Sequence, residues 1–149
     1  MITEVYFVRH AHSVFSLENE ETRELSEKGW IDAEKITQIL FQENINQIIS
    51  SSYVRARQTV EGLANLLNLE IELDTRFRER DLAARNHHFE NPEEAMQKVF
   101  SNPAYKFPGG ETNLEVQQRG IDGLRDAVKK YKGQKIGRAS CRERVSTSV

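Results

Sequence analysis

Short apolar runs alternate with longer stretches of helical spacing along residues 1–135. The apolar runs at 5–8, 45–49 and 69–73 predict strands, because each is bounded by polar or turn-forming residues. Helical stripes and helix-start signals predict helices from Ser26 to about Gln42, from Tyr53 to Leu67, from Asn91 onward and from Thr112 to about Lys132. This order of elements favours the α/β class, with a three-layer αβα architecture and a mostly parallel sheet.

Residues 136–149 break this pattern, because they show neither strand alternation nor a helical stripe. They look like the translation of a common sequencing-library adaptor, and a disordered basic tail is the alternative interpretation. We therefore expect residues 1–135 to be a partial domain and residues 136–149 to be a non-native or disordered tail. The strand that should follow the last helix is then missing, and the sheet is expected to be incomplete at the C-terminus.

Composition narrows the classes of protein and partner. Hydrophobic residues make up 38% and charged residues 30% of the 149 residues, which is typical of a globular chain. A net charge of −2 argues against a nucleic-acid partner. The absence of an apolar run of membrane-spanning length argues against a membrane partner, so we expect a cytoplasmic location. The only cysteine, Cys141, lies in the tail, so no disulfide framework is expected.

An arginine and a histidine stand at the end of the first predicted strand, where the apolar run up to Val8 is followed by Arg9 and His10. Ligands of open α/β sheets bind at the carboxyl ends of the strands. A guanidinium suits phosphate, and a neutral imidazole can act as a nucleophile. A surface loop explains an isolated Arg-His pair more often than chemistry does, so the pair gains weight only from similar groups at other strand ends.

Two such groups follow. Arg55 comes just after the second strand, where a helix N-terminus adds backbone donors for an anion. Arg57 is assigned instead to a solvated helix face or to a pair with Glu61. Glu79 follows the third strand, and an acid there can protonate a leaving oxygen if burial or a nearby phosphate favours its protonated form. A solvated charge run is the alternative for Glu79.

The three strand-end features agree in order and spacing with one family. From Glu4 to about Lys135 the chain resembles the histidine phosphatase superfamily, the phosphoglycerate-mutase-like group. The resemblance is carried by Val8–Ser13, Ser51–Thr59, Phe77–Arg80 and Pro108–Thr112, and Leu25–Gly29 is similar to the family's entry into its first helix.

The resemblance implies a two-step phosphoryl transfer from a small phosphorylated substrate. His10 would attack a phosphomonoester and become phosphohistidine, and water would then release phosphate. Arg9 and Arg55 would hold the phosphoryl oxygens, and Ser13 would donate a further hydrogen bond. Glu79 would act as general acid for the leaving alcohol and then as base for water. No metal and no cofactor are implied, and His12, His87 and His88 lack useful ligand spacing.

One departure from the family pattern is large. Family members carry a second catalytic histidine, usually followed by glycine, at the end of a later strand, but no histidine follows Glu111 in this chain. We interpret this as a lost segment rather than an evolved inactive variant. The chain as it stands is therefore expected to be inactive or severely impaired. It should also be poorly stable, because the missing strand leaves apolar helix faces exposed.

Three other functions remain open beside hydrolysis. A phosphoglycerate-mutase-type phosphotransferase would use the same histidine, although the short stretch between Glu79 and Gly109 offers no large lid and so favours hydrolysis. A non-catalytic phosphate-binding protein and a purely structural domain are the others. The sequence predicts neither the substrate nor the oligomeric state. Residues that could contact a leaving group, or simply pack together, are Phe15, Arg85, His87, His88, Tyr105 and Phe107.

Overall fold

The computed structural model describes residues 1–16 and 18–141, which form one parallel sheet with helices on both sides. In chain order the elements are β1 (Glu4–Arg9), α1 (Glu27–Phe41), β2 (Gln47–Ser50), α2 (Val54–Leu67), β3 (Ile71–Leu73), the 3-10 turn η1 (Thr75–Phe77), α3 (Pro92–Ser101), α4 (Asn113–Lys130) and β4 (Lys135–Ser140). The strand order is β1-β4-β2-β3, and every pairing is parallel. The α/β class, the αβα layers and the three predicted strands are confirmed.

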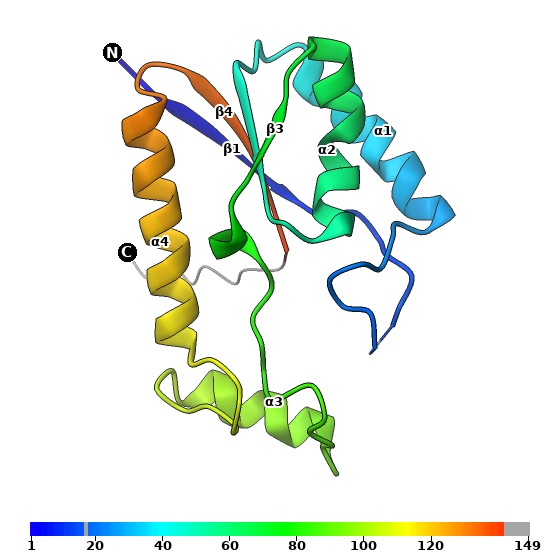
Figure 1. The fold of residues 1–149 in the computed structure, drawn as a ribbon, viewed down its shortest axis with the longest axis vertical. Coiled ribbons are helices and arrows are strands. Elements are labelled where there is room, and N and C mark those ends of the chain that lie inside the picture. Colours follow the sequence, from blue (N-terminus) through cyan, green and yellow to red (C-terminus); the bar gives the residue numbers. More distant parts are fainter. Residues whose placement is uncertain (17, 142–149) are drawn as a thin grey trace.

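Each face of the sheet has its own core. On one face Ile48 and Ala139 pack with Val60 and Leu63 of α2, and α1 packs against α2 outside them. On the other face Ile49 and neighbouring apolar residues pack against α4 and η1. Figure 1 shows α1 and α2 on one side of the strands and α4 on the other. The alternation of Ile48 and Ile49 between the two cores follows from the two-residue period of a strand.

The strand that the sequence pattern omits is present. Residues 135–140 form β4 in the centre of the sheet, where Val5 pairs with Ile136 and Ile48 pairs with Gly137. The expectation that this strand is missing is wrong for these residues, and so is the argument that its absence exposes the helices. Ladder hydrogen bonds use backbone groups, so a segment without apolar alternation can still occupy a gap between two strands. Residues 142–149 lie outside the described part, and the proposed foreign origin of the tail stays a prediction.

The helix starts follow the capping residues of the sequence. The Ser26 side chain accepts a hydrogen bond from the Gly29 amide at 3.1 Å and begins α1. A Cβ on Gly29 would lie 2.0 Å from the carbonyl oxygen of His12, so glycine allows α1 to approach the loop that follows β1. Trp30 and Ile39 follow the helical spacing of the apolar residues in this helix, but both are exposed. Within the described residues, no helix is long and apolar enough to cross a bilayer.

Candidate active site

Three side chains that follow three different strands lie at the carboxyl edge of the sheet. His10 follows β1, Arg55 lies in the first turn of α2 after β2, and Glu79 follows η1 after β3. Arg55 donates a hydrogen bond from Nη2 to the Glu79 carboxylate at 2.6 Å. Both groups act electrostatically on His10. This arrangement joins the residues that the sequence analysis singled out separately.

The imidazole of His10 is half-buried and held in one orientation. Its Nδ1 lies 2.7 Å from the carbonyl oxygen of Ala11, and because a carbonyl only accepts, Nδ1 carries the proton. The lone pair of the neutral ring is then on Nε2. Burial lowers the pKa of His10 from 6.5, and the charges of Arg55 and Arg23 lower it further, whereas the Ala11 carbonyl and Glu79 oppose them. The neutral, nucleophilic form therefore dominates at neutral pH.

Arg55 is fully buried and is surrounded by acceptors. Besides Glu79, its Nη2 donates to the Glu20 carboxylate at 2.7 Å, and its Nη1 donates to the Glu20 carbonyl. The guanidinium also lies over the Tyr53 ring, 4.9 Å from the centroid. Its Nε is buried with no hydrogen-bond partner among the described residues. A buried guanidinium that is paired with carboxylates can release one carboxylate and bind another anion in its place.

The sequence analysis missed two charged residues of the site. Arg23 lies 3.3 Å from Glu20 and 3.8 Å from Glu79, measured between guanidinium nitrogen and carboxylate oxygen, and its side chain is only 14% exposed. Both Glu20 and Arg23 belong to the polar stretch between the first strand and the first helix, for which the sequence pattern predicts neither a helix nor a strand. The only signal in the sequence was their spacing of three residues, which predicts a local ion pair and nothing about the sheet edge.

Two residues of the Ser51–Thr59 motif connect these segments. The Thr59 hydroxyl accepts from the Ala11 amide at 3.0 Å and donates to the Arg55 carbonyl at 2.7 Å, so it links the His10 loop to α2. Gln58 accepts from the Leu25 amide at 2.9 Å and thereby fixes the segment leading into α1. These contacts explain why α2 and the loop after β1 hold a common position.

Arg9 and Ser13 are not part of the described cluster. The Arg9 side chain is exposed and forms no ion pair within residues 1–16 and 18–141, and Arg9 pairs with Ser140 in the sheet register. Ser13 forms an isolated antiparallel bridge with Leu25. Their expected contacts with phosphate remain predictions. Arg57, which the analysis kept out of the site, is half-buried.

None of the other histidines belongs to a possible metal-binding cluster within the described residues. His12 is exposed, and its Nδ1 lies 2.7 Å from the hydroxyl of Ser26. His87 and His88 are exposed, and the His87 ring packs near Phe107, which in turn contacts Tyr105. Among the described residues, no three His, Cys, Asp or Glu side chains gather to hold a metal ion. Whether the chain needs a metal stays a prediction.

Cys141 directly follows β4, so it lies at the carboxyl edge of the sheet. It is buried, its Sγ lies 3.6 Å from the Ser51 hydroxyl, and its amide donates to the Phe77 carbonyl at 3.3 Å. Burial raises the pKa of the thiol, so it is neutral at pH 7. The residue at the end of this strand is therefore a neutral thiol and not an imidazole.

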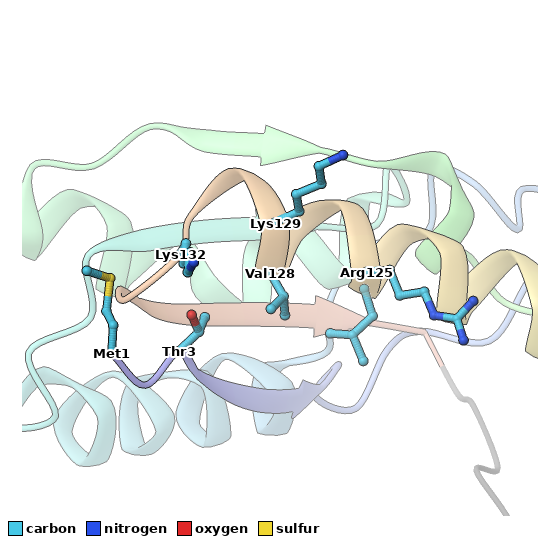
Figure 2. Close-up of a pocket in the computed structure, with 7 residues that line it drawn as sticks. Met1, Thr3, Arg125, Val128, Lys129 and Lys132 are labelled. Atoms are coloured by element: carbon cyan, nitrogen blue, oxygen red, sulfur yellow. The ribbon is translucent and has the colours of Figure 1, made fainter.

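The described residues also form an open groove of about 590 Å³ far from His10. Figure 2 shows Met1 and Thr3, which precede β1, facing Val128 of α4 and Lys132, which follows α4. The groove lies beside the start of β1, whereas His10 follows its end, so the groove is not the candidate active site.

The chain belongs to the histidine phosphatase superfamily. The model of branch 1 of this superfamily matches residues 5–140. Among curated relatives, a probable phosphoglycerate mutase GpmB of Cronobacter sakazakii is 31% identical over 126 residues, covering 78% of this chain and 59% of its own length. A protein of the same name from Photorhabdus laumondii is 27% identical, covering 90% and 65%. The chain thus spans about three-fifths of the length of these relatives.

Solved structures share the fold. Bacillus stearothermophilus YhfR superposes with a TM-score of 0.77 at 24% identity, covering 93% of this chain and 74% of that one. A phosphoserine phosphatase of Entamoeba histolytica gives a TM-score of 0.76 at 19% identity, covering 94% and 74%. The names of the relatives and structural neighbours include both mutases and phosphatases.

Proposed function

We propose that this chain carries the phosphoryl-transfer half of a histidine phosphatase site and that His10 forms a phosphohistidine from small phosphomonoesters. The observation that carries the proposal is the meeting of a half-buried neutral imidazole, a buried guanidinium and a carboxylate at one sheet edge. A nucleophile, an anion-binding cation and an acid are the three groups that such a transfer requires.

The chemistry runs in two displacements at phosphorus. The Nε2 lone pair of His10 attacks, the P–O bond to the alcohol breaks, and the leaving oxygen takes the proton of Glu79. Water then attacks the phosphohistidine, the P–N bond breaks, and the Glu79 carboxylate receives a proton from the water. Arg55 stabilises the phosphoryl oxygens in both transition states.

The remaining expected residues have supporting roles in this proposal. Arg9 would turn its exposed side chain toward the phosphoryl oxygens, and Ser13 would donate a further hydrogen bond. We propose no metal and no cofactor, because each step uses only side chains of this chain and water. The partner is a small phosphorylated molecule, and we keep the cytoplasm as the proposed location.

We further propose that residues 136–149 replace native sequence and that the second histidine belongs at position 141. The family resemblance places that histidine at the end of a later strand, and β4 ends at Ser140. The experiment that tests this compares the rates at which the chain and its Cys141→His variant hydrolyse p-nitrophenyl phosphate. We expect slow or absent turnover by the parent and an increase on the order of tenfold or more in the variant. Turnover by the parent at ordinary phosphatase rates would contradict this part of the proposal.

A phosphoglycerate-mutase-type phosphotransferase is the second candidate, supported by the names of curated relatives at 27–31% identity. Incubating the Cys141→His variant with 3-phosphoglycerate separates the two. Release of inorganic phosphate supports hydrolysis, and formation of 2-phosphoglycerate without loss of phosphate supports the mutase. Binding of phosphate with no covalent intermediate would support a phosphate-binding protein.

A further inference from the structure

The segment that carries Glu79 is held in place by an arginine of α4. Arg119 donates from Nη1 to the carbonyl oxygens of Arg76 at 2.6 Å and Arg78 at 3.1 Å, and from Nη2 to the Glu79 carbonyl at 3.3 Å. Its side chain is 13% exposed. One guanidinium therefore binds three carbonyl oxygens of the segment that ends at the candidate acid.

Glu111 binds the same segment from its other side. Its carboxylate pairs with Arg119 through two bonds, at 2.9 and 3.0 Å, and accepts from the Asp81 amide at 3.0 Å and from Arg78 at 3.1 Å. Burial alone would raise the pKa of Glu111, but the hydrogen bonds from Arg119 and the Asp81 amide outweigh it and lower that pKa. The pair is thus connected to the backbone on both sides of Glu79.

We propose that Arg119 and Glu111 are positioning residues that hold the Glu79 carboxyl against Arg55 and His10, an inference that rests on the function proposed above. The role of Glu79 itself belongs to that function. What is added here is that the acid is positioned from α4 and from the Pro108–Thr112 motif, and not by β3.

The glycines of that motif account for how Glu111 reaches the segment. A Cβ on Gly110 would lie 2.2 Å from the carbonyl oxygen of Leu82, and Gly109 adopts a φ of +76° against Ala84. Glycine is required for so close a backbone approach and for that φ. The approach ends in a hydrogen bond from the Glu111 amide to the Asp81 carbonyl at 2.7 Å. The motif therefore supplies a structural link to Glu79 rather than a contact with substrate.

Arg119 is placed equally firmly on its helix. Thr112 and Glu115 form a reciprocal capping box that begins α4. One turn after Arg119, Gly123 lets the helix approach Phe77, where a Cβ would lie 2.9 Å from a ring carbon. These contacts fix the position of α4 along its axis and its rotation relative to η1. The contacts of Arg119 with the three carbonyl oxygens follow from this packing.

The test is an NMR titration of the His10 imidazole in the whole chain, which needs neither phosphate nor turnover. The charged groups that act electrostatically on this ring are Arg55, Glu79 and Arg23. Because Glu79 raises the pKa of His10, Glu79→Gln should lower it. Arg119→Ala should lower it in the same direction by at least about half as much, and should add nothing in the Glu79→Gln background. Arg125→Ala, an exposed arginine of the same helix, is the control and should leave the titration unchanged.

The sign of the shift distinguishes positioning from a direct charge effect. Losing the positive charge of Arg119 by itself would raise the pKa of His10, whereas losing the hold on Glu79 lowers it. A rise, no change, or an equal shift in the Glu79→Gln background would overturn the inference. If Arg119→Ala does not fold, Arg119→Lys keeps the charge without the planar fork and should give a smaller fall. A negative result leaves phosphorylation of His10 untouched, so the two proposals fail independently.

Discussion

The Arg55 guanidinium donates to the Glu79 carboxylate at 2.6 Å although the Arg55 side chain is fully buried and the Glu79 side chain is 28% exposed. The pair joins the start of α2 to the segment after β3, which are separated by 24 residues. Glu20 occupies a further donor position of the same guanidinium. The Arg55 guanidinium is therefore already paired with protein carboxylates at the place where the proposed reaction needs a cation to hold phosphate.

Arg55→Ala should abolish binding of inorganic phosphate and destabilise the chain. The two carboxylates would lose their principal cation, and because both are partly exposed we expect a fall in the free energy of unfolding of about 2–3 kcal/mol, below the usual cost of breaking a fully buried pair. Calorimetric titration with phosphate and urea unfolding measure the two effects. Arg57→Ala is the matched control. Phosphate binding that persists in Arg55→Ala and disappears in Arg57→Ala would reverse the assignment.

The stability of the chain should depend on pH through His10. Because burial lowers the pKa of His10 below 6.5, the unfolded chain binds a proton at that position more readily than the folded chain. The contribution of His10 to stability is therefore present above pH 6.5 and is lost as the pH falls through the folded pKa. Urea unfolding between pH 5 and 7.5 should show this fall in the parent and a shallower one in His10→Asn. Identical pH dependence in the two chains would argue against a buried neutral imidazole.

Glu20→Gln should strengthen phosphate binding. The Glu20 carboxylate contacts Arg55 at 2.7 Å and Arg23 at 3.3 Å, so a phosphate must compete with it for both cations. Removing its charge should lower the dissociation constant for phosphate by roughly tenfold, which corresponds to about 1.4 kcal/mol. Glu21→Gln changes the neighbouring residue, which pairs with Arg85, and should have little effect. Weaker binding in Glu20→Gln would mean that this carboxylate supports the anion site instead of occupying it.

Arg138→Val should destabilise the chain. Arg138 is 4% exposed in the central strand β4, its guanidinium lies over the rings of Phe77 at 4.3 Å and Phe7 at 5.1 Å, and its Nη1 donates to the Ser140 hydroxyl at 3.2 Å. Valine loses these contacts and is smaller, so it leaves a cavity, and we expect a loss of about 2–4 kcal/mol by urea unfolding. Arg125→Val, at an exposed position of α4, is the control. Unchanged or increased stability would mean that these contacts of Arg138 do not support β4.

The sequence was sufficient to predict the parts of the fold that depend on neighbouring residues alone. Ser26 and Thr112 begin helices because their side chains bind the free amides of the first turn, and this can be inferred from a few neighbouring residues. β4 was missed because its place depends on a gap between β1 and β2, which backbone hydrogen bonds fill without an apolar pattern. Trp30 follows the apolar spacing of α1, but it is exposed because Ala33 and Leu40 define a narrower buried face.

The residues of the candidate site likewise divide into those that the sequence identified and those that only the structure revealed. His10, Arg55 and Glu79 were identified because each stands at a strand end, and parallel strands bring their carboxyl ends to one edge. Glu20 and Arg23 were missed because a polar loop carries no periodic signal that places it against the sheet. The role inferred for the Pro108–Thr112 motif also needed the structure, since the contact between Gly110 and Leu82 joins segments that are distant in sequence.

The covalent intermediate is the direct test of the central claim. The parent chain and its Cys141→His variant are incubated with p-nitrophenyl phosphate, denatured in alkali, digested and analysed by mass spectrometry. The account predicts acid-labile phosphate on His10 in at least the variant, and none when His10→Asn is added to either chain. Absence of phosphate on His10 in both folded chains, or equal labelling after His10→Asn, would contradict it.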